Sequence, residues 1–167
     1  MIPNPEAKQT VTLISDYTFV KVLQNKSTGQ KSLHASTRFY PGDVISPFSA
    51  GSTKRHPTYL TVQIADKKHI TLVPEFLQYI NHSCAPNVFF DTTKMELVCL
   101  KAMKPGEELT FFYPSTEWDM ASPFACNCGS RDCLQIISGA AQLSLDVLEK
   151  YRLTDFIRQK INQQVTI

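Results

Sequence analysis

Short hydrophobic runs, rich in β-branched and aromatic residues, follow one another from Thr10 to Val98. Residues typical of turns separate them at short intervals, and alternating strand–helix units are absent. The pattern therefore predicts many short β-strands in one β-rich domain. The runs expected to form strands are 11–14, 18–23, 43–48, 59–64, 69–73, 87–91 and 95–100, and the expected turns are 25–30, 41–42, 50–51, 65–68 and 105–106.

Helical spacing occurs in two places. In PEFLQYI (74–80), Pro74 suits a first helical turn, and the hydrophobic residues after it recur at helical intervals. Near the C-terminus, hydrophobic residues recur at helical spacing between Leu143 and Ile161, with Ser144 and Thr154 placed as N-caps of two helices. We expect this tail to pack on the body of the domain; a helix that binds a partner is the alternative.

The composition bounds the class of protein. The 167 residues include 17 basic and 15 acidic side chains, a formal charge of +2 that is too small and too evenly spread to predict a nucleic-acid interface. No hydrophobic run approaches the ~18 residues of a membrane helix, and Pro3, Pro5 and Glu6 stand where a signal peptide would be hydrophobic. We expect an intracellular protein, cytoplasmic or nuclear, with no membrane partner and no direct nucleic-acid binding. The sequence does not predict the oligomeric state.

Three of the five cysteines fall within eight residues, as Cys-x-Cys-x4-Cys in CNCGSRDC (126–133). An odd number of cysteines without a secretion signal argues against a disulfide framework, whereas such crowding suits a metal ion. Structural zinc needs four ligands, so a fourth must come from elsewhere. Cys84, Cys99 and His82 are the candidates, and free buried thiols are the alternative to a metal site. Gly129 lies where a tight knuckle needs a residue without Cβ.

Three segments carry the clearest chemical signal: NHSCAPN (81–87), GEELTFFY (106–113) and CNCGSRDC (126–133). Their sequence and order resemble the SET-domain family of protein lysine methyltransferases, with its post-SET segment. HASTRFYPGDVI (34–45) also resembles the early strand and turn of the family. One motif alone would be weak evidence, whereas three in the family's order are specific. The resemblance covers about residues 31–134.

The resemblance implies a mainly β (β-rich α+β) fold, in which the SET fold of small sheets with a pseudoknot is followed by a zinc-binding post-SET segment and C-terminal helices. In the pseudoknot the segment after ELTF passes under the NHSC segment, so the two motifs should be neighbours. Three parts are implied: a SET-like catalytic core over 10–115, a post-SET zinc-binding segment over 116–138, and a helical tail packed on the core over 139–167.

The resemblance also implies the cofactor S-adenosylmethionine. Asn81 and His82 would contact it, and Tyr113 would lie at the methyl-transfer centre. The full set of expected cofactor-binding residues is Ser32, Leu33, His34, Asn81, His82, Tyr113, Phe124 and Leu134, with Phe124 and Leu134 as an apolar wall against the adenine. The aromatic residues expected to line the substrate channel are Tyr59, Tyr79, Phe111 and Phe112.

The zinc ligands of the family match four cysteines of this chain. Cys84 of the NHSC segment would join Cys126, Cys128 and Cys133 around one structural zinc ion. This assignment leaves Cys99 as a thiol of the core.

The residue types suit methyl transfer to an amine. The reaction is an in-line displacement, so it depends mainly on positioning and desolvation. A lysine amine, whose pKa in water is ~10.4, must first lose its proton, and an apolar channel beside a positive sulfonium favours the neutral amine. Tyr113 offers a hydroxyl that can orient it. The first functional hypothesis is therefore an S-adenosylmethionine-dependent N-methyltransferase that acts on the lysine side chain of a protein or peptide, or on a small amine.

The Gly-x-Gly that usually opens the family's cofactor loop is missing. The aligned stretch is Gln30-Lys31-Ser32, and side chains there prevent the closest approach of backbone to cofactor. The second hypothesis is therefore a catalytically reduced or repurposed SET-like module that binds a partner or acts on a small molecule. A zinc ribbon for nucleic acid is the weakest alternative, because no basic stripe accompanies the cysteines.

Overall fold

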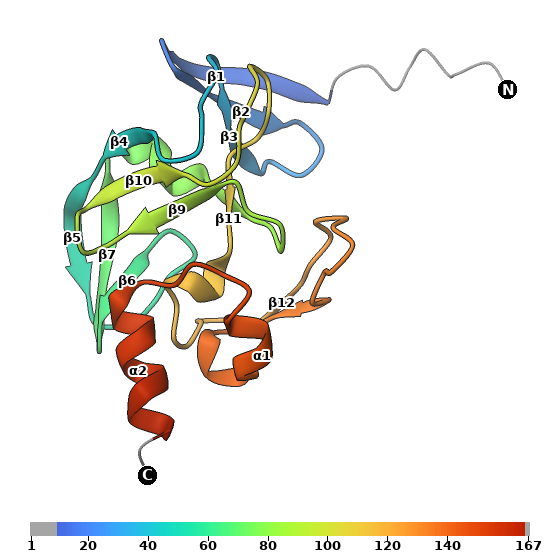
Figure 1. Cartoon of the computed structure of the whole chain (residues 1–167). Helices are drawn as coiled ribbons and strands as arrows, with labels where there is room; N and C mark the ends of the chain where they lie inside the picture. Colours follow the sequence, from blue (N-terminus) through green and yellow to red (C-terminus); the bar gives the residue numbers. More distant parts are fainter. Residues whose placement is uncertain (1–9, 166–167) are drawn as a thin grey trace, which may run out of the picture.

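We describe residues 10–165 of a computed structural model of the chain. Short strands form five small sheets in this part of the chain, as the hydrophobic pattern predicts (Figure 1). The strands are β1 Val11–Tyr17, β2 Val20–Asn25, β3 Lys31–Ala35, β4 Val44–Pro47, β5 Ser49–Lys54, β6 Val62–Ala65, β7 Lys68–Val73, β8 Asn81–His82, β9 Val88–Asp91, β10 Glu96–Cys99, β11 Thr110–Phe111, β12 Phe124–Ala125 and β13 Ile136–Ile137. The helices are the 3-10 helices η2 Glu75–Tyr79, η3 Tyr113–Ser115 and η4 Ala140–Gln142, and the α-helices α1 Leu145–Leu148 and α2 Asp155–Val165.

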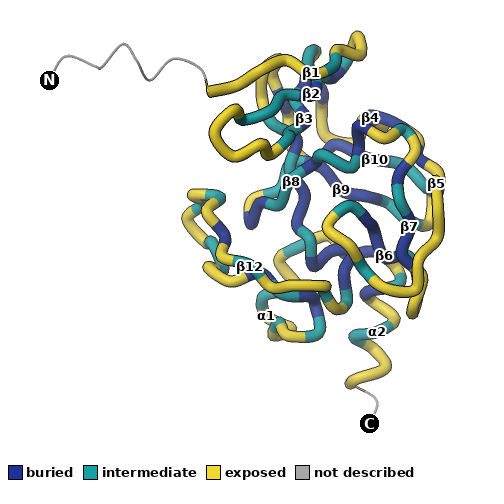
Figure 2. The backbone as a smooth tube through the Cα atoms, turned by 180° about the vertical axis from the view of Figure 1, so that it is seen from behind, coloured by how far each residue is buried: buried dark blue, intermediate teal, exposed yellow. Residues whose placement is uncertain are grey.

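Three sheets of three strands make the body: β1-β2-β3, β4-β10-β9 and β5-β7-β6, all antiparallel. The predicted helix after Pro74 is a 3-10 helix, η2, whose buried side chains Phe76 and Leu77 join the core. Within that core Phe90, Leu97, Ile70 and their neighbours exclude water, and Figure 2 shows the buried segments gathered between these sheets. Burial of apolar surface therefore fixes the body.

Two expectations for the central region are wrong. Ala50-Gly51 is not a turn but part of β5, where a Cβ on Gly51 would lie 2.8 Å from Thr71 Oγ1 of β7. The glycine serves a close approach between strands at a register shift. The predicted strand 59–64 begins only at Val62, because Thr58 and Thr61 bond to each other in a turn, with the Thr58 N–H donating to Thr61 Oγ1 at 2.8 Å.

The two central motifs lie side by side, as the pseudoknot requires. β8 of the first motif pairs in parallel with β11 of the second, Asn81 opposite Thr110. Asn87 adds three bonds to the second motif: its N–H donates to Thr110 O at 3.1 Å, its Oδ1 accepts from Thr110 N–H at 2.8 Å, and its Nδ2 donates to Glu108 O at 2.8 Å. The pairing brings segments more than twenty residues apart into one site.

The described part of the helical tail packs on the body. Ser144 caps α1 by accepting from Val147 N–H, and Thr154 caps α2 by accepting from Ile157 N–H. Tyr151, between the helices, stacks on Phe112 with ring centroids 3.6 Å apart. A second small core forms around Leu148, Leu153, Ile157 and Trp118. The apolar faces of these helices pack within the chain. This packing does not require the alternative, a helix that binds a partner.

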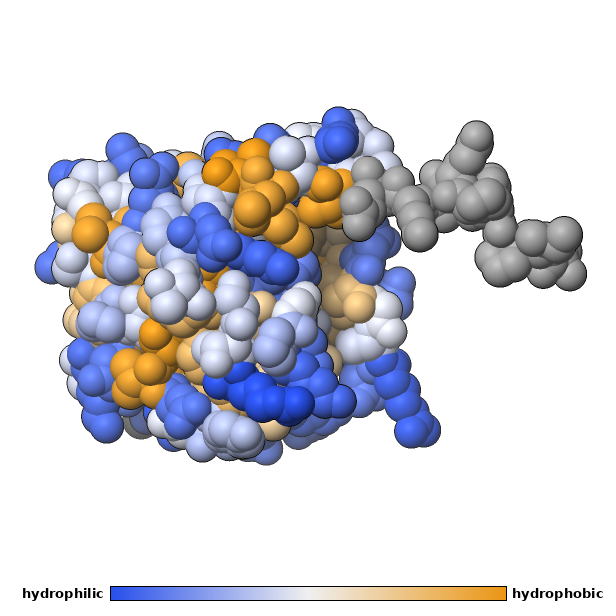
Figure 3. Space-filling view, turned by 90° about the horizontal axis from the view of Figure 1, so that it is seen from above, coloured by the Kyte–Doolittle hydropathy of each residue, from blue (hydrophilic) through white to orange (hydrophobic). Residues whose placement is uncertain are grey.

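No helix among residues 10–165 is long and apolar enough to cross a membrane. β1 carries several exposed hydrophobic side chains, those of Val11, Leu13 and Ile14. Figure 3 shows hydrophobic surface gathered near the N-terminal end of the described chain.

Candidate active site and cysteine cluster

His82 connects the two central motifs to the cysteines. Its Nδ1 accepts a hydrogen bond from the Tyr113 N–H at 3.1 Å, so the ring hydrogen lies on Nε2 and points to Cys84 Sγ, 3.4 Å away. Burial lowers the pKa of His82 to about 4, which keeps the ring neutral and preserves this donor–acceptor pattern. His82 therefore fixes the backbone at Tyr113 relative to the cysteine segment.

Asn81 is held by the stretch that replaces Gly-x-Gly. Its Oδ1 accepts from Gln30 Nε2 at 3.2 Å, and its Nδ2 donates to Lys31 O at 3.0 Å and to Glu108 Oε1 at 3.3 Å. The Gln30 side chain thus bonds to Asn81, a residue that the family resemblance assigns to cofactor contact. The loop is built differently from a glycine loop, as its sequence predicts.

A polar groove of about 610 Å³ lies beside these residues. Its walls combine amide, hydroxyl, imidazole and carboxylate groups with the two aromatic rings of Tyr113 and Phe124, a set that suits the amino-acid and adenosine parts of S-adenosylmethionine. Its lining residues include Gln30, Ser32, His34, Asn81, His82, Glu108, Tyr113 and Phe124.

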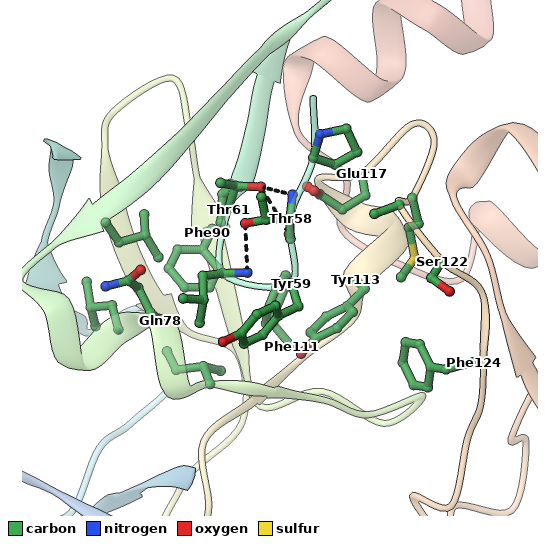
Figure 4. Close-up of a pocket in the computed structure, with 18 residues that line it drawn as sticks. Thr58, Tyr59, Thr61, Gln78, Phe90, Phe111, Tyr113, Glu117, Ser122 and Phe124 are labelled. Atoms are coloured by element: carbon green, nitrogen blue, oxygen red, sulfur yellow. Dashed lines mark hydrogen bonds between the residues drawn. The ribbon is translucent and has the colours of Figure 1, made fainter. Parts of the chain in front are cut away.

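An apolar cavity of about 140 Å³ lies next to the groove (Figure 4). Leu77, Ile80, Phe90 and Phe111 of the core form much of its wall. Tyr113 also lines it; burial, followed by the nearby Glu117 and Glu108 carboxylates, raises the pKa of this tyrosine to about 12. The Tyr113 hydroxyl is therefore protonated across the working pH range of proteins and can donate a hydrogen bond.

Tyr113 and Phe124 line both the apolar cavity and the polar groove. They also line a third hollow of about 500 Å³, which Tyr59, Tyr79 and Gln78 share. These two aromatic rings, 5.8 Å apart between centroids, thus mark the point where the three spaces meet. A ligand in the groove and another in the cavity would approach each other there.

The predicted channel residues divide into three groups. Phe111 lines the cavity, and Tyr59 lines it while remaining 87% exposed. Tyr79 lines the adjoining hollow, with Lys31 Nζ 4.9 Å from its ring centroid. Phe112 lines none of these spaces: it is 1% exposed and stacks on Tyr151. Successive residues of an extended segment point to opposite sides, so Phe111 and Phe112 cannot both face the cavity.

The predicted cofactor residues are also split. Ser32 and His34 line the groove, and their side chains bond to each other at 2.9 Å. The Leu33 side chain, between them, is fully buried in the core, and its carbonyl accepts from Leu109 N–H, so it does not face the groove. Leu134 packs in the cysteine cluster, where its N–H donates to Cys84 Sγ at 3.4 Å.

The four predicted zinc ligands come together. The Sγ atoms of Cys84, Cys126, Cys128 and Cys133 all lie within 4.8 Å of one another. Burial raises the pKa of the Cys84 thiol, so a thiolate there requires a nearby cation. Four convergent thiols on this scale fit a tetrahedral zinc ion. Cys99 lies apart as a buried core thiol that donates to Lys101 O.

Sequence reasoning missed Glu117 and Glu108. Glu117 is buried beside the cavity, and Glu108 bonds to Asn81 in the groove. Glu117 follows Tyr113 by four residues, a separation that places two side chains on one side of a helical turn. That spacing was the available signal for Glu117 in the sequence. It could be used only if the segment that begins with η3 were known to form a helical turn.

The pattern of the SET domain family matches residues 6–114. The chain belongs to the SET domain family, and the class that follows from it is a SET-domain methyltransferase. Methyltransferase flvH of Aspergillus flavus is 37% identical over 129 residues, which cover 75% of this chain and 72% of that protein.

Other relatives match shorter stretches. The H3 lysine-36 specific histone-lysine N-methyltransferase of Chaetomium globosum is 34% identical over 71 residues, 39% of this chain and 8% of that protein. Human histone-lysine N-methyltransferase 2D is 39% identical over 62 residues, 34% of this chain and 1% of that protein. The crystal structure of KRYPTONITE in complex with mCHG DNA and SAH superposes with a TM-score of 0.55 at 21% identity, covering 70% of this chain and 28% of that one. This likeness shows the SET-like fold.

Proposed function

We propose that the protein transfers a methyl group from S-adenosylmethionine to the side-chain amine of a lysine in a protein or peptide. The observation that carries the proposal is the junction at Tyr113 and Phe124 between a polar groove and an apolar cavity. A methyl donor in the groove and an amine in the cavity would meet there, and the displacement needs the two held close together and oriented.

Each space has a separate task in this proposal. Asn81, His82 and Glu108 of the groove hold the cofactor, which supplies an electrophilic methyl group when bound. The cavity accepts the alkyl chain of lysine, excludes water and favours the neutral amine. The Tyr113 hydroxyl, which stays protonated, orients the amine by a hydrogen bond. Phe124 separates bulk water from the junction and presents an aromatic face that favours a positive charge.

The choice of lysine is supported by relatives named for that reaction. The fungal and human relatives described above are histone-lysine N-methyltransferases, and they match 34–39% of this chain. A histone substrate would place the protein in the nucleus, and another protein substrate would be equally consistent with a cytoplasmic location. flvH is named only as a methyltransferase, so a small amine stays the alternative substrate.

The test is incubation of the purified protein and labelled S-adenosylmethionine with histones, cell extract and free lysine. We expect label in a protein fraction, and Tyr113→Phe to lower kcat about tenfold to a hundredfold because one orienting hydroxyl is lost. Tyr40→Phe is the matched control, since Tyr40 is 59% exposed and lines none of the three spaces. Label in no fraction, or equal loss in both variants, would contradict the proposal.

The second candidate, a repurposed module without catalysis, is favoured by the hydrogen bond from Gln30 to Asn81. It predicts that isothermal titration detects no S-adenosylmethionine binding. Methyl transfer by the wild-type protein that disappears in Tyr113→Phe would exclude it.

We also propose one structural zinc on Cys84, Cys126, Cys128 and Cys133, and the three-part division at residues 115 and 138. The separate cores support that division: one cluster lies within residues 20–111, another surrounds the cysteines, and a third belongs mainly to the tail.

A further inference from the structure

Glu117 is a buried carboxyl group beside the proposed reaction centre. The residue is 6% exposed and follows η3, where its N–H donates to Tyr113 O at 3.0 Å. Its side chain and that of Tyr113 line the same apolar cavity (Figure 4). One helical turn therefore presents a hydroxyl and a carboxyl group to one small space.

The carboxyl group is fixed by two hydrogen bonds to the same oxygen. Oε2 accepts from Gln63 N–H of β6 at 2.9 Å and from Thr116 Oγ1 at 2.8 Å, and Oε1 receives neither bond. Because Oε2 is held by neighbouring protein atoms, Oε1 is the oxygen left for a ligand in the cavity.

No cation of the described chain compensates this carboxyl. The other titratable residues that line the cavity are Tyr59 and Tyr113, and no lysine, arginine or histidine does so. Burial raises the pKa of Glu117 to about 7 despite its two hydrogen bonds. A carboxyl group without a cationic partner in an apolar cavity is costly, and groups with strongly perturbed pKa values cluster at functional sites.

We propose that Glu117 binds the ammonium group of the substrate in the cavity and accepts its proton, so that it selects amine substrates. This inference rests on the proposed function. In the step an N–H bond of the substrate ammonium breaks, an O–H bond forms on Glu117 Oε1, and the electron pair stays on nitrogen. The neutral amine can then take the methyl group, and Glu117 later releases the proton to water.

The neighbouring charges face other surfaces. His69 of β7 stands opposite Gln63 in the sheet register, and burial lowers its pKa. Lys160 of α2 lies over the Trp118 ring and bonds to Asp66 at 3.0 Å. The titratable residues of the surface hollow around Gln63 and Trp118 are Arg55, His56, Asp66, Lys67, His69 and Asp119. None of these residues lines the apolar cavity, so a titration near pH 7 in the cavity belongs to Glu117.

The first measurement needs no methyl transfer. n-Butylammonium, which has the length of a lysine side chain, and butan-1-ol, its neutral counterpart, are titrated into the protein at pH 8 and followed by NMR. We expect butylammonium to bind about tenfold more tightly than butanol, and Glu117→Gln to abolish this preference while leaving butanol binding unchanged. Glu149→Gln, the same change at an exposed residue, is the control. Equal binding of the two probes, binding of neither, or an unchanged preference in Glu117→Gln overturns the inference.

The second measurement is the pH profile of methyl transfer. In the wild-type protein kcat/KM should rise through pH 7 as Glu117 ionises, and Glu117→Gln should lose this step and about tenfold of kcat/KM at pH 8. Gln keeps an oxygen for Gln63 and Thr116, so a purely structural role predicts an unchanged profile. Methyl transfer that Glu117→Gln leaves unchanged overturns this inference alone. Probe binding that depends on Glu117 without any methyl transfer leaves the cation site standing and rejects the proposed function.

Discussion

The apolar cavity and the polar groove meet at the same two rings, yet they are built in opposite ways. The cavity is walled by core residues such as Leu77, Ile80 and Phe90, which are buried by three surrounding sheets. The groove is walled by half-buried polar groups such as Asn81 and His82, which hydrogen bonds hold in place. Packing holds the walls of the cavity in place, whereas a network of individual hydrogen bonds holds the walls of the groove.

The difference indicates which space can adapt. A well-packed apolar wall resists change, because any shift creates a void or a clash. A polar groove near the surface can exchange one hydrogen-bond partner for another at a cost of about 1 kcal/mol. We therefore expect substrate selection to depend on a rigid cavity, and cofactor affinity to depend on exchangeable contacts. Three perturbations test this contrast.

Removing the proposed zinc ion should have the largest effect, because it acts on both spaces. Phe124, which lines both, lies two residues before Cys126, and His82 connects Cys84 of the cluster to Tyr113. Structural zinc contributes on the order of 10 kcal/mol to local folding. Cys128→Ser should lose the zinc found by metal analysis, expose residues 116–138 to protease and abolish methyl transfer.

Cys99→Ser is the matched control, because Cys99 is a buried thiol of the core and not of the cluster. It should keep zinc and protease resistance. Full protection of the segment in Cys128→Ser without zinc would show that packing alone holds it.

Glu117→Gln should act on the cavity alone, and it should change how the free energy of unfolding depends on pH. In the folded protein the pKa of Glu117 is about 7, against an ordinary 4.5, so the folded state binds the proton more tightly. Below pH 4.5 the carboxyl is protonated in both states and has no effect; as the pH rises to 7 and above, the wild-type protein loses stability on the order of 3 kcal/mol. The variant lacks this loss.

Urea unfolding of both proteins at pH 4 and pH 8 measures the difference. We expect the variant to gain stability relative to wild type between the two values, although it loses activity. If the free energy of unfolding of the two proteins changed equally with pH, Glu117 would be ionised at no cost in stability. A partner that does not line the cavity would then stabilise its charge. A functional residue often lowers the stability of the folded protein, while its removal lowers the activity.

The sequence predicted the parts of this molecule that a local pattern determines. Most of the strand runs, the caps Ser144 and Thr154 and the cysteine cluster depend on nearby residues, and they appear in the structure. The motifs also placed Asn81 beside the second segment, because the family resemblance carries long-range information.

The sequence could not predict to which side of its segment each side chain points. Phe112 was assigned to the channel with Phe111, but the pleat turns it to Tyr151. Leu33 was assigned to the cofactor with its neighbours, but it alternates into the core. Glu117 has no sufficient signal in its own segment, because the proposed role needs β6 to supply a hydrogen bond from a residue 54 positions away. Motifs identify segments, whereas the side of a segment that faces a ligand is set by tertiary packing.

Changing Gln30 should have the smallest effect and should act on the groove alone. Gln30→Ala removes the side chain that donates to Asn81 Oδ1 at 3.2 Å. Alanine is chosen because glycine would also increase the conformational freedom of the backbone. If this contact competes with the cofactor, the variant should bind S-adenosylmethionine up to about tenfold more tightly in isothermal titration, the equivalent of one exposed hydrogen bond. Gln24→Ala is the control, because Gln24 bonds to Gly29 O in the same hairpin and not to Asn81. Weaker cofactor binding in Gln30→Ala would instead mean that Gln30 orients the Asn81 amide for the cofactor, and that the missing glycines are replaced by a side chain that helps to bind it.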